Sequence, residues 1–239
     1  MGNAERRWPA MRSRARPVLS LGDPEGNGAR VLACLLDADD APWHHAVTEV
    51  RGVEADALLD AIAPAARLLG DHWMADTLSM VDITIASARL EAGLRHLAAP
   101  AARAARGPTL PVLVPPWEQH SLAAHLAAHR LCAAGRHAVV LPDLAPEAAA
   151  RMPLVARAPA ILVACVDRPA RRRLENYLRR LGDDLRGPQR LLFVGGPGFG
   201  GTPEPRASLP YGARIVDDPL LASAGGNLYD PPVASSHSG

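Results

Sequence analysis

The sequence predicts an α/β protein in which a four-helix bundle is followed by a Rossmann-like domain built on a parallel sheet. Two observations support this prediction. In the first half of the 239-residue chain, apolar residues recur at three- and four-residue spacings, which is the period of amphipathic helices. The second half alternates short apolar runs with helical segments, an order typical of parallel sheets covered by helices.

The composition is that of a globular protein. Hydrophobic residues make up 48% of the chain and charged residues 21%, and the formal net charge is +1. These values exclude a disordered chain and a protein that coats nucleic acid through charge alone. No apolar stretch reaches the roughly 18 to 20 residues of a membrane span. Because the N-terminus also lacks the apolar core of a signal peptide, we expect a cytoplasmic protein.

The cysteines indicate neither a disulfide framework nor a zinc site. Cys34, Cys132 and Cys165 are odd in number and widely spaced, without a Cys-x-x-Cys pair or a Cys/His cluster. Free cysteines are usually buried. We therefore expect three buried thiols.

Shifts in composition divide the chain into parts. Residues 1–18 are rich in arginine and predict a disordered basic arm, and residues 225–239 are rich in Gly, Ser and Pro and predict a disordered tail. Between them we expect a helical bundle over residues 19–100 that caps a Rossmann-like domain over residues 108–224. The Ala, Arg, Gly and Pro stretch over residues 100–108 is the expected linker.

The first half predicts helices over residues 29–36, 44–50, 55–71 and 79–97. The third has one apolar stripe, formed by Leu58, Leu59, Ile62, Ala65, Ala66 and Leu69. Pro64 lies inside this helix, where its ring should lower stability or force a kink.

The fourth helix opens with a Ser-x-x-Asp sequence, Ser79 to Asp82. This spacing predicts a capping box, in which each side chain satisfies a backbone N–H of the first turn. The expected packing face of this helix consists of Val81, Ile85, Ala88, Ala92 and Arg95, of which the first four are its apolar part.

The second half predicts strands over residues 110–114, 137–141, 160–166, 191–194 and 213–216. The expected helices between them cover residues 122–134, 146–155 and 170–181. Ligands of such sheets bind at the carboxyl ends of the strands. The loops of interest are therefore residues 115–121, 167–169 and 195–202.

The loop after the first strand contains Glu118-Gln119-His120. A neutral imidazole can bind a metal with one nitrogen while the other donates to a carboxylate, which orients the ring. Most loop histidines have no such role, so the triplet alone is weak. His125 and His129 follow at helical spacing and indicate a histidine-rich helix face more than a metal pair. The glycine-rich loop 195–201 lacks the features of a dinucleotide or P-loop motif.

Three segments together resemble cobalamin-binding proteins. The loop Glu118-Gln119-His120-Ser121-Leu122-Ala123 resembles the Asp-x-His-x-x-Gly motif of cobalamin-binding Rossmann-like domains, with Glu for Asp and Ala for Gly; light-sensing members often have Glu-x-His. Pro64 to Trp73 resembles the Pro-x-x-x-x-Leu-Gly-x-x-Trp signature of the helical bundle in these proteins. Gly195-Gly196 matches the family's Gly-Gly after the fourth strand, whereas Ala164-Cys165-Val166 stands where the family has Ser-x-Leu.

The resemblance implies a role for each of these residues. His120 would be the lower ligand to cobalt, with Glu118 as the carboxylate that orients it. Trp73 would cover the upper face of the corrin ring, with His72 and Met74 as candidates to approach that face after photolysis. The other implied cofactor-binding residues are Ser121, Leu122, Ala164, Val166, Gly195 and Gly196. The hydroxyl that would bind the nucleotide tail is missing at Ala164.

The start of the expected fourth helix resembles one group of cobalamin-binding proteins more than others. Val81-Asp82-Ile83-Thr84-Ile85 is similar to the Asp-Val-Thr stretch of the AerR/PpaA antirepressors, whereas photoreceptors of the CarH and LitR type have Glu-His where Ile83 and Thr84 stand. This likeness implies a light-responsive antirepressor that acts through a CrtJ/PpsR-type repressor of photosynthesis genes and reaches DNA only through that partner. A purely capping role for Asp82 is the alternative.

Two other functions fit the same fold. A corrinoid shuttle for methyl transfer would normally keep the complete histidine-loop and Ser-x-Leu motifs, so Ala123 and Ala164 argue against it. A haem sensor could use His120 as its iron ligand. The sequence has no Ser/His/Asp or Cys/His arrangement placed for nucleophilic catalysis, and we expect a protein that is not an enzyme.

Overall fold

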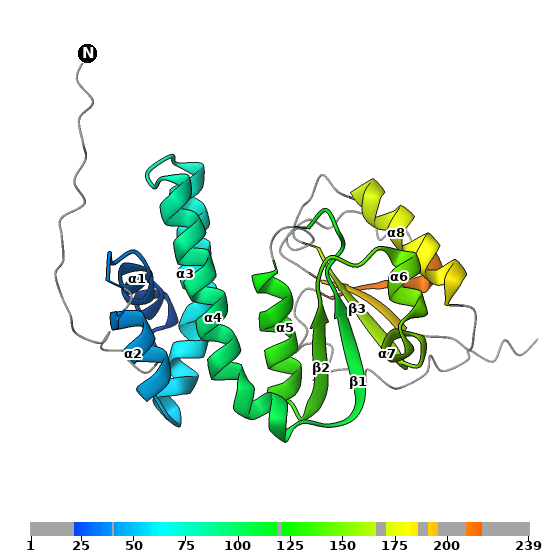
Figure 1. Ribbon diagram of the computed structural model, residues 1–239, viewed down its shortest axis with the longest axis horizontal. Helices are drawn as coiled ribbons and strands as arrows, with labels where there is room; N and C mark the ends of the chain where they lie inside the picture. Colours follow the sequence, from blue (N-terminus) through cyan, green and yellow to red (C-terminus); the bar gives the residue numbers. More distant parts are fainter. Residues whose placement is uncertain are drawn as a thin grey trace, which may run out of the picture. The chain divides into compact units, whose positions relative to one another are not determined.

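The computed structural model describes residues 22–39, 41–118, 121–165, 171–185, 191–195 and 209–216. The chain divides into two units, Met1–Leu97 and Ala98–Gly239, whose elements are labelled in Figure 1. The predicted arm and tail, residues 1–18 and 225–239, lie outside the described residues. No helix of the described residues has both the length and the hydropathy needed to cross a membrane.

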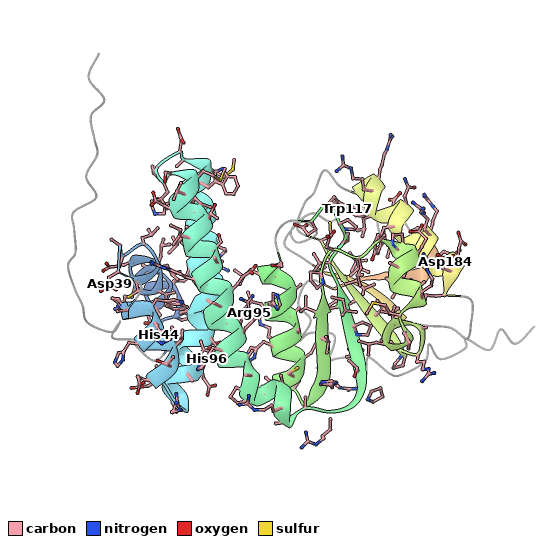
Figure 2. The ribbon with its side chains drawn as sticks, viewed as in Figure 1. Asp39, His44, Arg95, His96, Trp117 and Asp184 are labelled. Carbon is pink, nitrogen blue, oxygen red and sulfur yellow. The ribbon has the colours of Figure 1, made fainter. Side chains whose placement is uncertain are left out.

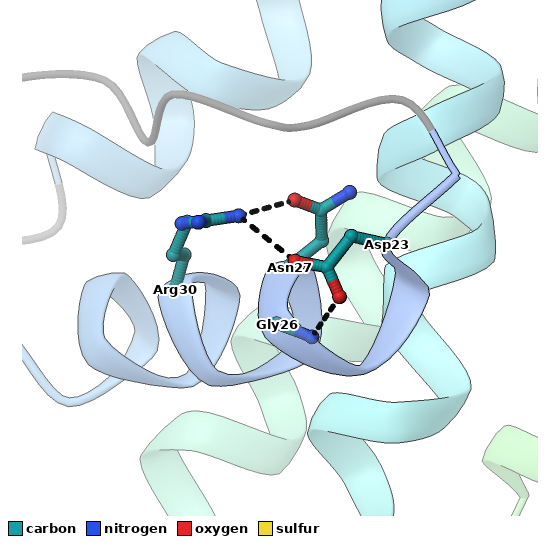
Figure 3. Close-up of polar contacts among 4 residues, drawn as sticks. All are labelled: Asp23, Gly26, Asn27 and Arg30. Carbon is teal, nitrogen blue, oxygen red and sulfur yellow. Dashed lines mark hydrogen bonds and ion pairs between the residues drawn. The ribbon is translucent and has the colours of Figure 1, made fainter.

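The first unit contains the four predicted helices. They are α1 (Pro24–Leu35), α2 (Ala41–Glu49), α3 (Val53–Met74) and α4 (Met80–Ala104). Helix α1 begins earlier than residue 29, where we expected it. Its Asp23 carboxylate accepts the backbone N–H of Gly26 at 2.9 Å, and Arg30 donates to Asn27 at 2.8 Å (Figure 3). This N-cap stabilises the start of the helix, where Gly26 and Gly28 lower the helix propensity of the sequence.

Helix α1 packs against α3. The apolar stripe predicted for α3 is confirmed for Leu58, Ile62, Ala65 and Leu69, which are buried, whereas Leu59 and Ala66 are only partly buried. Helix α3 continues through Pro64 to Met74. A Cβ at Gly28 of α1 would lie 2.5 Å from the Cβ of Pro64, so the two helices approach closely where neither has a large side chain.

The packing face predicted for α4 is wrong. Val81, Ile85, Ala88 and Ala92 are all exposed. The residues of α4 that are buried are Ile83, Ala86, Leu90, Gly93, Leu94 and Leu97. Both sets have helical spacing, so the sequence alone offered two apolar stripes. Gly93 decides between them, because the absence of a side chain lets the indole of Trp43 approach the backbone of α4 there.

The second unit contains a five-stranded parallel sheet in the order β2-β1-β3-β4-β5. Its strands are β1 (Arg106–Leu113), β2 (Arg136–Leu141), β3 (Ala160–Ala164), β4 (Leu191–Gly195) and β5 (Arg214–Val216). The helices are α5 (Leu122–Ala133), α6 (Pro146–Arg151), α7 (Pro153–Ala156), α8 (Arg171–Asp184) and the 3-10 helix η2 (Pro210–Gly212). The predicted fold class, a helical bundle followed by a Rossmann-like parallel sheet, is confirmed.

Helices cover both faces of the sheet, as Figure 1 shows. One face packs against α5 through an alanine-rich core that includes Val112, Leu131 and Leu162. The other face packs against α6, α7 and α8 through a core that includes Ile161 and Leu178. Neighbouring residues of β3 thus belong to different cores, as alternation along a strand requires.

Two predicted boundaries differ from the structure. The expected helix over residues 146–155 is split into α6 and α7 at Met152, because the following proline disfavours helical backbone in the residue before it. The expected linker is helical as far as Ala104, and β1 starts at Arg106. The Arg106 guanidinium donates to the carbonyls of Arg103 and Ala104 at 2.9 and 2.8 Å, which satisfies the end of α4.

Candidate functional site

The strand order places a topological switch point between β1 and β3. These two strands are neighbours in the sheet. The chain leaves β1 toward α5 on one face, and it leaves β3 toward α8 on the opposite face. Because the two connections diverge, a crevice forms at the carboxyl ends of such strands, and ligands of open α/β sheets bind there. The histidine loop follows β1 directly at this point.

The loop after β1 turns back toward the sheet. Its start is tied to β2, since the Val114 N–H donates to the Leu141 carbonyl at 3.0 Å. The Glu118 N–H then donates to the Pro115 carbonyl at 2.9 Å, which closes a turn. This turn leaves Glu118 only 8% exposed. A carboxylate is rarely buried unless it is paired, and this one lies where the sequence predicted a partner for a ligating histidine.

His120 itself lies outside the described residues, as does Gln119. The residues that flank them in the chain are described. Glu118 ends the turn, and Ser121 leads into α5, where its carbonyl accepts the His125 N–H at 3.1 Å. Ser121 and Leu122 are half-buried at the start of α5. The structure thus places Glu118, Ser121 and Leu122 between the carboxyl end of β1 and the start of α5, and their role in binding stays a prediction.

Small residues end β3, which neighbours β1, and β4, which neighbours β3. Ala164 of β3 pairs with Gly195 of β4, and the Cys165 N–H donates to the Gly195 carbonyl at 3.0 Å. Ala164 belongs to the core on the α5 face, and the register places Gly195 on the same face. No bulky side chain projects from these two positions. Val166 and Gly196, also predicted as binding residues, lie outside the described residues.

Sequence reasoning missed Trp117. This residue lies beyond the carboxyl ends of the strands (Figure 2), and its ring meets Tyr177 of α8 edge to face, with 5.5 Å between ring centroids and an interplanar angle of 83°. The Tyr177 hydroxyl donates to the Leu144 carbonyl at 3.0 Å. Burial, with the nearby Glu147 charge, raises the pKa of Tyr177, so its hydroxyl stays protonated as a donor. The sequence feature that could have identified Trp117 is its position next to Glu118, because a large aromatic residue stands there in a loop.

The predicted upper-face residues lie at the turn between α3 and α4. Trp73 is 47% exposed and Met74 is 87% exposed. Met80, Val81 and Ile85 of α4 are also exposed. His72 is half-buried, and its Nδ1 lies 2.8 Å from the hydroxyl oxygen of Thr77. These exposed apolar side chains form a surface, which we call the turn surface, consisting of Trp73, Met74, Met80, Val81 and Ile85.

The described cysteines and histidines add no metal cluster. Cys132 and Cys165 are buried as predicted, but Cys34 is only partly buried. Within the described part of the chain, no three His, Cys, Asp or Glu residues are grouped closely enough to hold a metal ion. A corrin or a haem supplies its own equatorial nitrogens, so a single protein ligand is sufficient for either.

Comparison with solved structures shows which proteins share this fold. The structure of the Methanosarcina barkeri monomethylamine corrinoid protein matches with a TM-score of 0.59 and 15% sequence identity, over 83% of this chain and 93% of that chain. The chain shares the fold of that corrinoid protein.

Two weaker matches are also proteins described in connection with cobalamin. A cobalamin-binding protein from Desulfitobacterium hafniense DCB-2 matches at 15% identity over 82% of this chain and 94% of that chain, with a TM-score of 0.38. A chain of the Methanosarcina barkeri methanol:cobalamin methyltransferase complex matches at 14% identity over 86% of this chain and 80% of that chain, also with a TM-score of 0.38. Scores this low do not establish a shared fold. No family model and no curated protein matches the sequence.

Proposed function

We propose that this chain binds a cobalamin, with His120 as the lower ligand to cobalt and Glu118 as the carboxylate that orients its ring. The observation that supports this most strongly is the burial of Glu118 at the switch point, two positions before His120 in the chain. A carboxylate that accepts from one imidazole nitrogen holds the other nitrogen unprotonated for the metal. The shared fold with a corrinoid protein supports the same cofactor.

The surrounding residues fit a tetrapyrrole with a nucleotide tail. Ala164 and Gly195 end their strands without bulky side chains, which would let a bulky group approach the backbone closely at the ends of these strands. Ala164 offers no hydroxyl, so the tail would be held with fewer hydrogen bonds than a serine allows. Trp73 and Met74 offer apolar surface suited to the upper face of a corrin.

We further propose that the protein is a light-responsive antirepressor of the AerR/PpaA type and not an enzyme. If the bound cobalamin carries an alkyl group at its upper axial position, it would supply a weak cobalt–carbon bond that light can break. His72 and Met74 are the candidates to approach that position afterwards. The residues Val81 and Ile85, which belong to the resemblance, are exposed and could meet a CrtJ/PpsR-type repressor. Through that repressor the chain would act on DNA.

A titration with hydroxocobalamin tests the cofactor. Wild-type protein should bind it with a shift of the visible bands, H120A should lose the shift, and E118Q should weaken it. A suitable control is H137A, since His137 lies near the amino end of β2 and its Nδ1 is 2.7 Å from the Thr109 hydroxyl oxygen. Wild-type protein that stays colourless, or an unchanged spectrum in H120A, rejects cobalamin ligation by this histidine. Parallel incubation with haem tests the haem alternative.

The second candidate function is a corrinoid shuttle for methyl transfer. It is favoured by the fold shared with the monomethylamine corrinoid protein. Two assays separate the candidates. An antirepressor should change the mobility of a repressor–DNA complex, with a difference between dark and illuminated protein, whereas a shuttle should accept a methyl group in a methyltransferase assay with reduced corrinoid. Methyl transfer without an effect on the repressor would reject the antirepressor proposal.

A further inference from the structure

The indole N–H of Trp117 is buried and has no hydrogen-bond partner among the residues that the structure describes. The indole N–H can only donate a hydrogen bond, so it needs an acceptor atom. A buried donor without an acceptor destabilises a protein, and native structures contain few of them. Where one occurs beside a candidate ligand site, it calls for an explanation.

Packing contacts fix the position of the Trp117 ring. Its ring packs against the core under α6, α7 and α8 and makes the edge-to-face contact with Tyr177. Tyr177 is itself fixed by its bond to the Leu144 carbonyl. The ring therefore has little freedom to turn its N–H toward another acceptor. Its donor stays in the loop that carries Glu118 and, further along, His120.

We propose that the Trp117 N–H donates a hydrogen bond to an oxygen acceptor on the bound cobalamin. This inference rests on the proposed function. Cobalamin carries acceptors of two kinds outside the corrin ring, the carbonyls of its amide side chains and the phosphate of its nucleotide tail. Either accepts from an indole N–H in the same way. The bond makes Trp117 a binding residue that favours ligands with oxygen acceptors outside the ring. It acts in addition to the proposed contact between His120 and cobalt.

The test compares two tryptophans that differ in their partners. In W117F the unpartnered donor is removed, and the dissociation constant for hydroxocobalamin should rise about three- to tenfold, as expected for one hydrogen bond. The control is W43F, because the Trp43 N–H already donates to the Arg89 carbonyl at 2.8 Å. W43F should lower the melting temperature of the full chain and leave the dissociation constant unchanged.

A second variant separates the N–H from the size of the ring. Incorporation of the benzothiophene isostere of tryptophan at position 117 replaces the N–H by sulfur and keeps the shape. It should weaken hydroxocobalamin binding by the same factor as W117F. If the isostere binds as tightly as wild-type protein, the role of Trp117 is packing and the inference is overturned.

Titration with cobinamide, which lacks the nucleotide tail, identifies the acceptor. An equal loss of affinity for cobinamide and hydroxocobalamin in W117F assigns the bond to an amide side chain, and a loss for hydroxocobalamin alone assigns it to the phosphate. Both results support the inference. W117F that binds both ligands like wild-type protein overturns it. Wild-type protein that binds no cobalamin overturns the proposed function itself, which is a different outcome.

Discussion

The indole ring of Trp43 in α2 lies against the backbone of Gly93 in α4, so closely that a Cβ at Gly93 would be 2.2 Å from Cζ2 of the ring. The same indole donates its N–H to the Arg89 carbonyl, one turn earlier in α4. Arg89 in turn donates to the carbonyl of Leu35, the last residue of α1, at 2.9 Å and to that of Asp37 at 2.7 Å. This chain of contacts links α1, α2 and α4.

Replacing Gly93 by alanine should therefore destabilise the helical unit. We expect G93A to lower the free energy of unfolding by about 1–3 kcal/mol, the usual cost of overpacking, as measured by urea denaturation. A matched control is G70A in α3, where an added Cβ meets nothing within 4 Å. G70A should raise stability by about 0.5–1 kcal/mol, because alanine favours helix over glycine. Equal effects of the two substitutions would contradict the packing described.

The Ser79–Asp82 capping box should stabilise the start of α4. The Asp82 N–H donates to the Ser79 hydroxyl at 3.2 Å, and that hydroxyl donates to the Asp82 carboxylate at 2.7 Å. S79A and D82A should each cost about 0.5–2 kcal/mol, and the double variant less than their sum, because the two residues form one unit. Amide hydrogen exchange of residues 80–84 is the sensitive measurement, since loss of a cap frays the first turn.

The same variants test whether Asp82 has a functional role. If Asp82 only caps the helix, S79A and D82A should impair the interaction with a repressor to the same extent. D82A that impairs the interaction while S79A does not would indicate a direct contact of the carboxylate with the partner.

The free energy of unfolding should decrease at alkaline pH because of the ionisation of Cys34. Burial, with the negative charge of Asp37, raises the pKa of the Cys34 thiol from 9.0 to about 11. The neutral thiol is thus favoured in the folded state, so this contribution is complete below pH 9 and is lost as the pH rises toward 11. Denaturation of wild-type protein and C34S across this range should show a shallower decline for C34S. If stability declines equally with pH in wild-type protein and in C34S, Cys34 is not the cause of the decline.

Trp73 should matter for the ligand and little for folding. Because its side chain is about half exposed at the turn surface, W73A should change the free energy of unfolding by about 1 kcal/mol or less. It should weaken hydroxocobalamin binding and, in protein loaded with an alkylcobalamin, alter the spectral change on illumination. The contrasting variant is L69A, since Leu69 is buried in the same helix and its truncation should cost about 2–5 kcal/mol. Unchanged photochemistry in W73A would remove Trp73 from the site.

Sequence patterns identified the fold because each pattern depends on local spacing. The stripe on α3, the Ser79–Asp82 box and the alternation of strands with helices all follow from residues close together in the chain. Burial of Glu118 after the end of β1 was not predicted by any local pattern, and its role as a partner of His120 stays a prediction. The roles of His120, Val166 and Gly196 stay predictions, because these residues lie outside the described ranges.

By itself, the sequence determined the fold class, the loop that follows β1 and the residue types available there. Tertiary structure decided which of two apolar stripes of α4 is buried, because that depends on the fit of Trp43 to Gly93. It also decided that Trp117 meets Tyr177 and keeps a buried N–H unpaired within the described residues. Such contacts join residues far apart in the chain, and no local period encodes them.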